Sequence, residues 1–209
     1  MTEFDTAARA DSTPEGPSGH LRARLGGEIA ALDRAIYGAV RSTPTPTLDK
    51  SMKWISNAAD GSRLWVLIAA ALAVVGGRRG RRAAIRGLVA VGVTSATANL
   101  GAKQLFPRRR PRRPVTTAER EEHETKMPTS SSFPSGHTAS AFAFATTVTL
   151  DVPALALPLY GLAAIVGYSR VHNGVHHPSD VMAGGVLGLT VGSAVRAITA
   201  RHGPLKPSS

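Results

Sequence analysis

Residues 152–169, VPALALPLYGLAAIVGYS, form the longest uncharged run of the chain. The run has 18 residues, about the length at which an apolar helix can cross a bilayer, and it contains Pro153 and Pro158. Shorter uncharged runs lie at residues 64–77, 87–102, 138–150 and 181–195. Run length alone therefore leaves a membrane bundle and a soluble helical bundle both open.

Two features of these runs favour the membrane. Small residues recur between Leu and Val, as at residues 94–98 and at Gly184, Gly185, Gly188 and Gly192, and such residues line close helix contacts in membrane bundles. The flanking charges are mostly Arg and Lys, whose long side chains reach the headgroups. No run alternates with period two. The sequence predicts an all-α, multi-span transmembrane bundle in the cell membrane. Its five expected spans are residues 60–77, 83–103, 136–151, 153–170 and 180–199.

The segments before and after this bundle differ from it in composition. Residues 1–20 are polar and rich in Gly and Pro, and we expect them to be disordered. Residues 24–41 have helical spacing of Ile29, Leu32, Ile36 and Val40, with charges that argue against a span, so we expect an interfacial amphipathic helix. A second short amphipathic helix is expected at 48–59. The expected organisation is therefore an N-terminal segment 1–47, a bundle domain 48–200 and a tail 201–209.

The composition narrows the kinds of chemistry. The chain has 25 Lys and Arg against 14 Asp and Glu, a formal net charge of +11, and no Cys. The lack of Cys excludes a disulfide scaffold, a thiol nucleophile and Cys-ligated metals. The positive charge points to an anionic partner, which nucleic acid, an anionic membrane and a phosphorylated substrate all satisfy.

Five alternating spans bring four chain ends to one membrane side. These are the end of the second span at Lys103, the start of the third at His137, the end of the fourth at Arg170 and the start of the fifth at Asp180. Most residues able to carry chemistry lie near these ends. We therefore expect a functional site there.

Three clusters supply that site. Residues 103–114, KQLFPRRRPRRP, read either as a basic loop for lipid headgroups or nucleic acid, or as a phosphate clamp. Residues 130–137, SSSFPSGH, precede a helix, and a helix N-terminus with Ser and Gly suits an anion. In residues 169–180, SRVHNGVHHPSD, the spacing of four between His176 and Asp180 lets a carboxylate orient an imidazole. A metal site formed by His172, His176, His177 and Asp180 is a competing interpretation, which the neighbouring cations disfavour.

The clusters together resemble the motifs of a known family. Lys103-x6-Arg110-Pro111, Pro134-Ser135-Gly136-His137 and Ser169-Arg170-x5-His176-x3-Asp180 are similar to the three motifs of the type 2 phosphatidic acid phosphatase (PAP2) family, which extends to vanadium haloperoxidases and bacterial acid phosphatases. Arg113-Pro114 is a second Arg-Pro pair, three residues after Arg110-Pro111, and offers an alternative register for the first motif. The resemblance covers about residues 48–199.

The resemblance implies an all-helical PAP2/haloperoxidase-like core and phosphoester hydrolysis without a metal or other cofactor. His176 would be the nucleophile that forms a phosphohistidine, Asp180 would orient it, and His137 would protonate the leaving oxygen. The phosphoryl oxygens would be held by Lys103, Arg110, Ser135, Gly136 and Arg170.

The apolar runs direct this expectation to a lipid phosphate in the bilayer, with no nucleic-acid partner. A polyprenyl phosphate or diphosphate carrier is favoured and a phosphatidate-type lipid is next, as in bacterial undecaprenyl-diphosphatase-like members. The alternative is a catalytically inactive basic membrane protein that binds anionic lipid or nucleic acid. The residues leave open the oligomeric state and, because basic residues divide about evenly, the membrane side of the site.

Overall fold

A computed structural model describes residues 17–43, 45–111 and 130–201, and every regular element in these ranges is helical. The helices are α1 (Pro17–Ser42), α2 (Pro46–Ala59), α3 (Arg63–Val75), α4 (Gly77–Ala96), α5 (Lys103–Leu105), α7 (Gly136–Asp151), α8 (Ala156–His172) and α9 (Pro178–Arg201). Short 3-10 helices lie at Asp60–Ser62 (η1) and Pro153–Leu155 (η3), and a π-helix lies at Thr97–Ala102 (η2). The predicted all-α class is confirmed.

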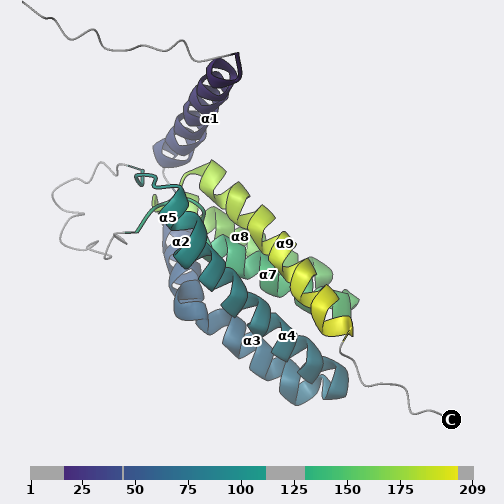
Figure 1. Cartoon of the computed structure of the whole chain (residues 1–209). Helices are drawn as coiled ribbons and strands as arrows, with labels where there is room; N and C mark the ends of the chain where they lie inside the picture. The colour runs from purple at the N-terminus through teal and green to yellow at the C-terminus, as the bar shows by residue number, and fades with distance from the viewer. Residues whose placement is uncertain (1–16, 44, 112–129, 202–209) are drawn as a thin grey trace, which may run out of the picture.

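Four helical stretches are long and apolar enough to cross a membrane. They are Pro46–Val75, Gly77–Leu105, Pro153–His172 and Pro178–Ala200. The chain is a multi-pass membrane protein, as predicted. Helices α3, α4, α7, α8 and α9 run side by side in one bundle (Figure 1). The first stretch joins α2 and α3 through Gly61 and Ser62, which both have positive φ, whereas the sequence predicted a span that began only at residue 60.

The remaining expected span, α7, is the central helix of the bundle. It has 16 residues, fewer than a spanning helix needs, and twelve of them are buried. Its buried positions are mostly Ala and Thr, which let α4, α8 and α9 pack closely around it. Thus one of the five expected spans is an enclosed helix and does not meet the length of a free span.

Glycines set the contact between α7 and α9. A Cβ atom at Gly188 would lie 2.3 Å from the Ala139 carbonyl oxygen, and one at Gly184 would lie 2.5 Å from that of Ser135. Gly192 continues the stripe one turn later, 2.8 Å from the Ala143 oxygen. The small residues therefore do what their pattern predicted, because any side chain would force the two helices apart.

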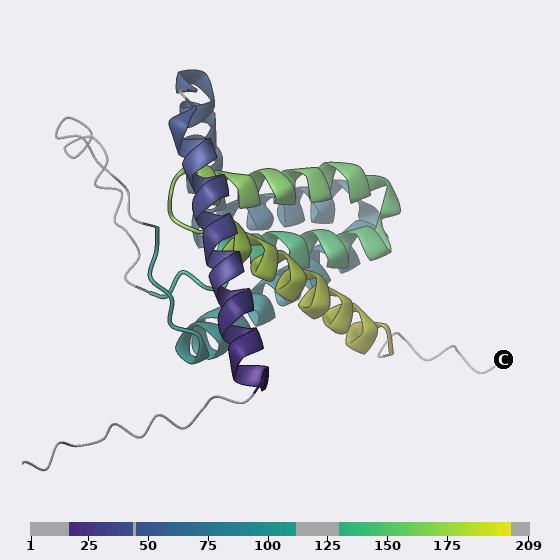
Figure 2. The ribbon, with the colours of Figure 1, turned by 90° about the horizontal axis from the view of Figure 1, so that it is seen from above.

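The N-terminal helix α1 lies across one end of the bundle (Figures 1 and 2). It begins at Pro17, so the expected disorder of residues 17–20 is wrong, while residues 1–16 lie outside the described part. Ile29, Leu32 and Ile36 are exposed, as an interfacial helix requires, and the buried residue is Asp33. The face of α1 that contacts the bundle is therefore mixed, with the charged Asp33 beside the half-buried Tyr37 and Val40.

The same end of the bundle gathers the three predicted clusters. The π-helix η2 continues α4 to Lys103, the segment 130–135 leads into α7, and the loop 173–177 joins α8 to α9. These segments meet where α7 and α9 begin and α8 ends.

Candidate active site

His176 lies in the loop between α8 and α9 and is almost fully buried. Gly174 has φ of +68°, a turn that favours glycine, and the backbone N–H groups of Val175 and His176 then donate to the Arg170 carbonyl. The His176 Nδ1–H donates to the Ser132 carbonyl oxygen at 2.7 Å, which assigns the tautomer. The Nε2 atom is thereby left with its lone pair, which accepts a hydrogen bond from Arg110 Nη1 at 3.3 Å.

The charge state of His176 suits a nucleophile. Burial lowers the pKa of His176 to about 4, and the positive charges of Arg110 and Arg170 act in the same direction, against the opposing effect of Asp180. The imidazole is therefore neutral at pH 7, and its lone pair is available without prior loss of a proton.

Asp180 was expected to orient His176, and its position is close but indirect. Its Oδ2 atom lies 3.7 Å from His176 Nδ1, beyond hydrogen-bond distance. The same carboxylate accepts from the backbone N–H of His177 at 2.8 Å. Asp180 thus holds the loop through the neighbouring backbone and acts on the ring by charge.

Arg108 is a residue of this site that the motif analysis did not single out. Its Nη1 donates to Asp180 Oδ1 at 2.6 Å, and its Nη2 donates to Asp33 Oδ2 of α1 at 2.6 Å. Ser179 completes the network through its backbone N–H and hydroxyl, both of which donate to Asp33. Burial alone would raise the pKa of Asp33, but the hydrogen bonds from Ser179 and Arg108 hold it below its usual value. Arg108 therefore links Asp33 of α1 to Asp180, the carboxylate next to His176.

The predicted phosphate-binding side chains come from three separate segments. Lys103 Nζ donates to Asn99 Oδ1 at 2.8 Å and lies 4.0 Å from where a Cβ at Gly136 would be. Arg110 donates to the Val175 carbonyl at 2.7 Å, beside His176. Lys103 thus lies at the N-terminus of α7, and Arg110 lies against the loop that carries His176.

Arg170 and Ser135, two further predicted phosphate-binding residues, are both buried. Arg170 Nη1 donates to the Ser56 hydroxyl, while its Nε is buried with no hydrogen-bond partner among the described atoms. Ser135 is the residue before α7, and its backbone N–H donates to the Asp180 carbonyl at 3.0 Å. The first of these bonds joins the end of α8 to α2, and the second joins the starts of α7 and α9. The free N–H groups of the first turn of α7 are suited to an anion.

His137, the predicted proton donor, has a partner that sequence reasoning missed. Its Nε2 lies 2.6 Å from Asp60 Oδ1, at the start of η1. Asp60 also lies 3.8 Å from Arg170 Nη1. Burial lowers the pKa of His137, and the charges of Arg170 and Lys103 act in the same direction. The aspartate opposes this shift and so favours the protonated imidazole, the form that donates a proton. Only the packing of η1 against α7 reveals the pair, since 77 residues separate the two.

The competing metal site does not assemble among the described residues. His172 Nε2 lies 2.7 Å from Asp49 of α2, and His177 packs edge-on against Tyr37 of α1. No group of three potential ligands from His, Asp and Glu occurs within residues 17–43, 45–111 and 130–201. The alternative Arg113-Pro114 register lies outside those ranges.

Known proteins resemble this chain in sequence and in fold. Residues 83–204 match the model of the PAP2 superfamily. A decaprenylphosphoryl-5-phosphoribose phosphatase of Mycobacterium tuberculosis is 34% identical over 138 residues, which are 64% of this chain and 71% of that protein. A lipid A 1-phosphatase of Porphyromonas gingivalis is 43% identical over 65 residues, which are 29% of this chain and only 15% of that protein.

Two solved structures share the fold. The transmembrane PAP2-type phosphatidylglycerolphosphate phosphatase of Bacillus subtilis has a TM-score of 0.64 at 24% identity, covering 86% of this chain and 90% of that one. LpxE of Aquifex aeolicus has a TM-score of 0.60 at 23% identity, covering 78% and 94%. The family match begins at residue 83, so α1, α2 and α3 lie before it.

Proposed function

This chain belongs to the PAP2 superfamily, a family of phosphatases, and we propose that it hydrolyses the phosphate ester of a membrane lipid through a phosphohistidine intermediate without a metal ion. One observation carries the proposal. A buried neutral imidazole presents Nε2 3.3 Å from a guanidinium, at the end of a membrane-spanning bundle. This pairs a nucleophile with a cation that can hold the phosphoryl group.

In the first step, His176 Nε2 attacks phosphorus and the bond to the lipid oxygen breaks. His137 gives its proton to that oxygen, so the lipid alcohol leaves neutral and the phosphoryl group stays on His176. In the second step, His137 removes a proton from water, which attacks phosphorus and releases inorganic phosphate. His176 is then neutral again and His137 is again protonated.

The cations replace what a metal ion would supply. Lys103, Arg110 and Arg170 carry fixed positive charge, and the first turn of α7 adds backbone N–H groups. These charges would therefore stabilise the negative charge that spreads over the phosphoryl oxygens in the transition state.

A lipid substrate is supported by apolar residues near the site. Leu100, Leu105 and Phe106 are all more than half exposed and lie within three residues of Lys103. A lipid tail would cover them while the phosphate contacts Lys103. We propose a polyprenyl-linked phosphate as the preferred substrate and a phosphatidate-type lipid as the next, supported by the decaprenylphosphoryl substrate in the name of the mycobacterial relative.

Phosphate release from a lipid panel by detergent-purified protein, with EDTA throughout, tests the proposal. We expect release from polyprenyl phosphates above release from glycerolipid phosphates, and complete loss in His176→Ala. His172→Ala is the matched control, because that histidine pairs with Asp49 of α2 and has no role in the proposed reaction. Equal activity of the two variants would refute the nucleophile assignment, and restoration by a divalent metal alone would refute the metal-free mechanism.

A further inference from the structure

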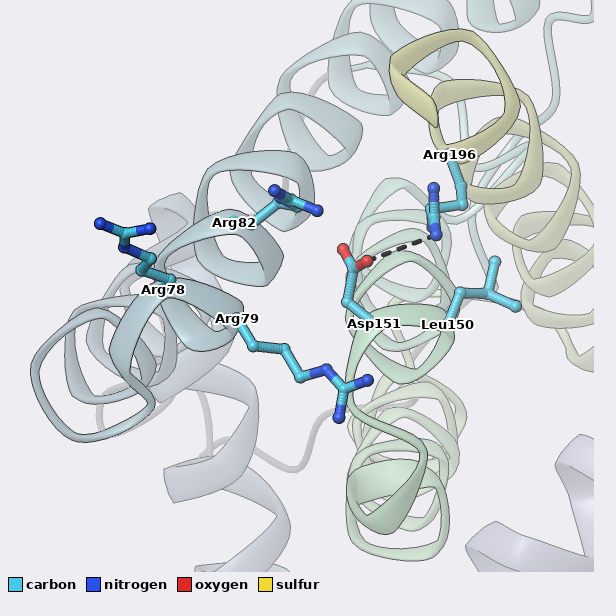
Figure 3. A pocket seen from close by; sticks show the side chains of 6 residues that line it. All are labelled: Arg78, Arg79, Arg82, Leu150, Asp151 and Arg196. Atoms are coloured by element: carbon cyan, nitrogen blue, oxygen red, sulfur yellow. Dashed lines mark ion pairs between the residues drawn. The ribbon is translucent and has the colours of Figure 1, made fainter. Parts of the chain in front are cut away.

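A pocket lies at the opposite end of the bundle from His176. Its volume is about 390 Å³, and it lies between the start of α4 and the ends of α7 and α9 (Figure 3). It is lined by Arg78, Arg79, Arg82, Leu150, Asp151 and Arg196. We propose that this pocket binds the phosphate of an anionic phospholipid whose acyl chain follows an adjoining apolar groove.

The pocket carries excess positive charge. Asp151 is its one acidic lining residue, and both of its oxygens already accept from Arg86 Nη1, at 2.8 and 3.0 Å. Arg196 contributes a further contact to the same carboxylate at 3.4 Å. Arg79 and Arg82 make no hydrogen bond or ion pair with any described side chain. The charge of Asp151 is thus neutralised by Arg86 and Arg196, and the guanidinium groups of Arg79 and Arg82 lack a counter-charge among the described side chains.

The position of these arginines on α4 strengthens the case for an anion. They lie in the first two turns of a 20-residue helix whose first turn contains no acidic residue. The N-terminus of a helix carries partial positive charge, so cations there repel the helix dipole as well as each other. Arg82 and Arg196 face the same space from two different helices (Figure 3). A phosphate in that space would relieve both repulsions.

An apolar groove of about 540 Å³ adjoins the pocket and distinguishes a lipid from a free phosphate. Arg82 lines both, and the groove adds Ile85, Arg86, Ile198 and Thr199. Ile85 is 65% exposed and Ile198 is 60% exposed, on two helices that cross the membrane. A headgroup and an acyl chain would occupy both parts together, whereas inorganic phosphate would occupy only the first. Neither lining contains a histidine, both oxygens of Asp151 accept from Arg86, and the Thr199 hydroxyl donates to the Val195 carbonyl at 2.8 Å. The bound lipid is therefore a ligand and not a substrate.

The lack of native cysteine allows a direct test on the full chain. A bimane attached at Leu150→Cys would report on the pocket in phosphatidylcholine vesicles. One vesicle preparation would contain phosphatidylglycerol with a nitroxide near its headgroup. The other would contain phosphatidylcholine with the same label. We expect stronger quenching by the anionic lipid. Arg82→Gln should weaken that preference about five-fold, the factor that one basic side chain contributes at a membrane surface.

Arg81→Gln is the matched control, since Arg81 is exposed on the same helix but does not line the pocket. It should keep the preference. Equal quenching by the two lipids would overturn the proposal. So would equal loss in the Arg81 and Arg82 variants, which would indicate only general surface charge. The proposal would also be overturned if millimolar inorganic phosphate removed the preference while Ile85→Gln left it unchanged. That result would show that the pocket binds free phosphate and not a phospholipid.

Discussion

Replacement of Arg108 by Gln tests how far α1 belongs to the catalytic site. In the folded chain this guanidinium lies 2.6 Å from Asp180 and 2.6 Å from Asp33. The Asp180 side chain is fully buried and that of Asp33 is 4% exposed, so the substitution leaves two buried carboxylates without their cation. Removal of one partner of a buried pair costs about 3–5 kcal/mol.

The side chain of Arg108 is 28% exposed, so solvent reaches the pair and we expect the lower end, about 3 kcal/mol. For a chain of this size, that corresponds to a Tm lower by about 6–12 °C. Phosphate release at a permissive temperature should fall at least about ten-fold, because Asp180 loses the group that holds it under His176.

Thermal unfolding in detergent and phosphate release with EDTA would measure both effects, and Arg109→Gln is the control because Arg109 is exposed beside it. In a double-mutant cycle, Asp33→Asn should cost less in the Arg108→Gln background than alone, with a coupling energy of about 1–3 kcal/mol. Equal Tm values for the Arg108 and Arg109 variants, or additive effects of the two network substitutions, would refute the reasoning.

Three further predictions concern single contacts. Asp60→Asn should lower kcat at least about ten-fold with little change in KM, because it weakens proton donation by His137; a change in KM alone would contradict this. Gly188→Ala should lower Tm despite its better helix propensity, because its Cβ would lie 2.3 Å from a carbonyl oxygen. Gly185→Ala, with its nearest contact at 3.8 Å, should be neutral or stabilising, and a loss in both would contradict the packing argument. Because the pKa of His176 falls to about 4 in the folded chain, the unfolded chain binds up to one proton more than the folded chain between pH 6.5 and 4. Tm should therefore fall as pH falls through that range, and His176→Asn should flatten the slope; an unchanged slope would refute the buried neutral ring.

The local sequence predicted most of the helices because apolar runs and charge punctuation are short-range properties. α8 begins and ends within a few residues of the expected span, and α2 matches the expected amphipathic helix closely. The count of spans was less secure. The composition of α7 is that of an apolar span, and only its contacts reveal that it is short and enclosed by other helices.

The partners of the site residues were predicted less well than the residues themselves. The spacing of four made Asp180 the expected acceptor for His176, yet the ring bonds to the Ser132 carbonyl. That contact depends on how the segment before α7 folds back on the loop after α8. Backbone carbonyls carry no sequence signal, so such a partner is invisible before the fold is known.

The sequence by itself determined that the chain is a helical membrane protein and predicted phosphate-binding and imidazole chemistry for it. Helix period, apolar run length and motif spacing can each be read within a single segment of the chain. Only the tertiary structure decided that Asp33 and Arg108 support Asp180, that Asp60 faces His137 and that arginines from α4 and α9 share a pocket. Those pairs are separated by dozens of residues, and a charged side chain looks alike in sequence whether it faces water or a buried partner.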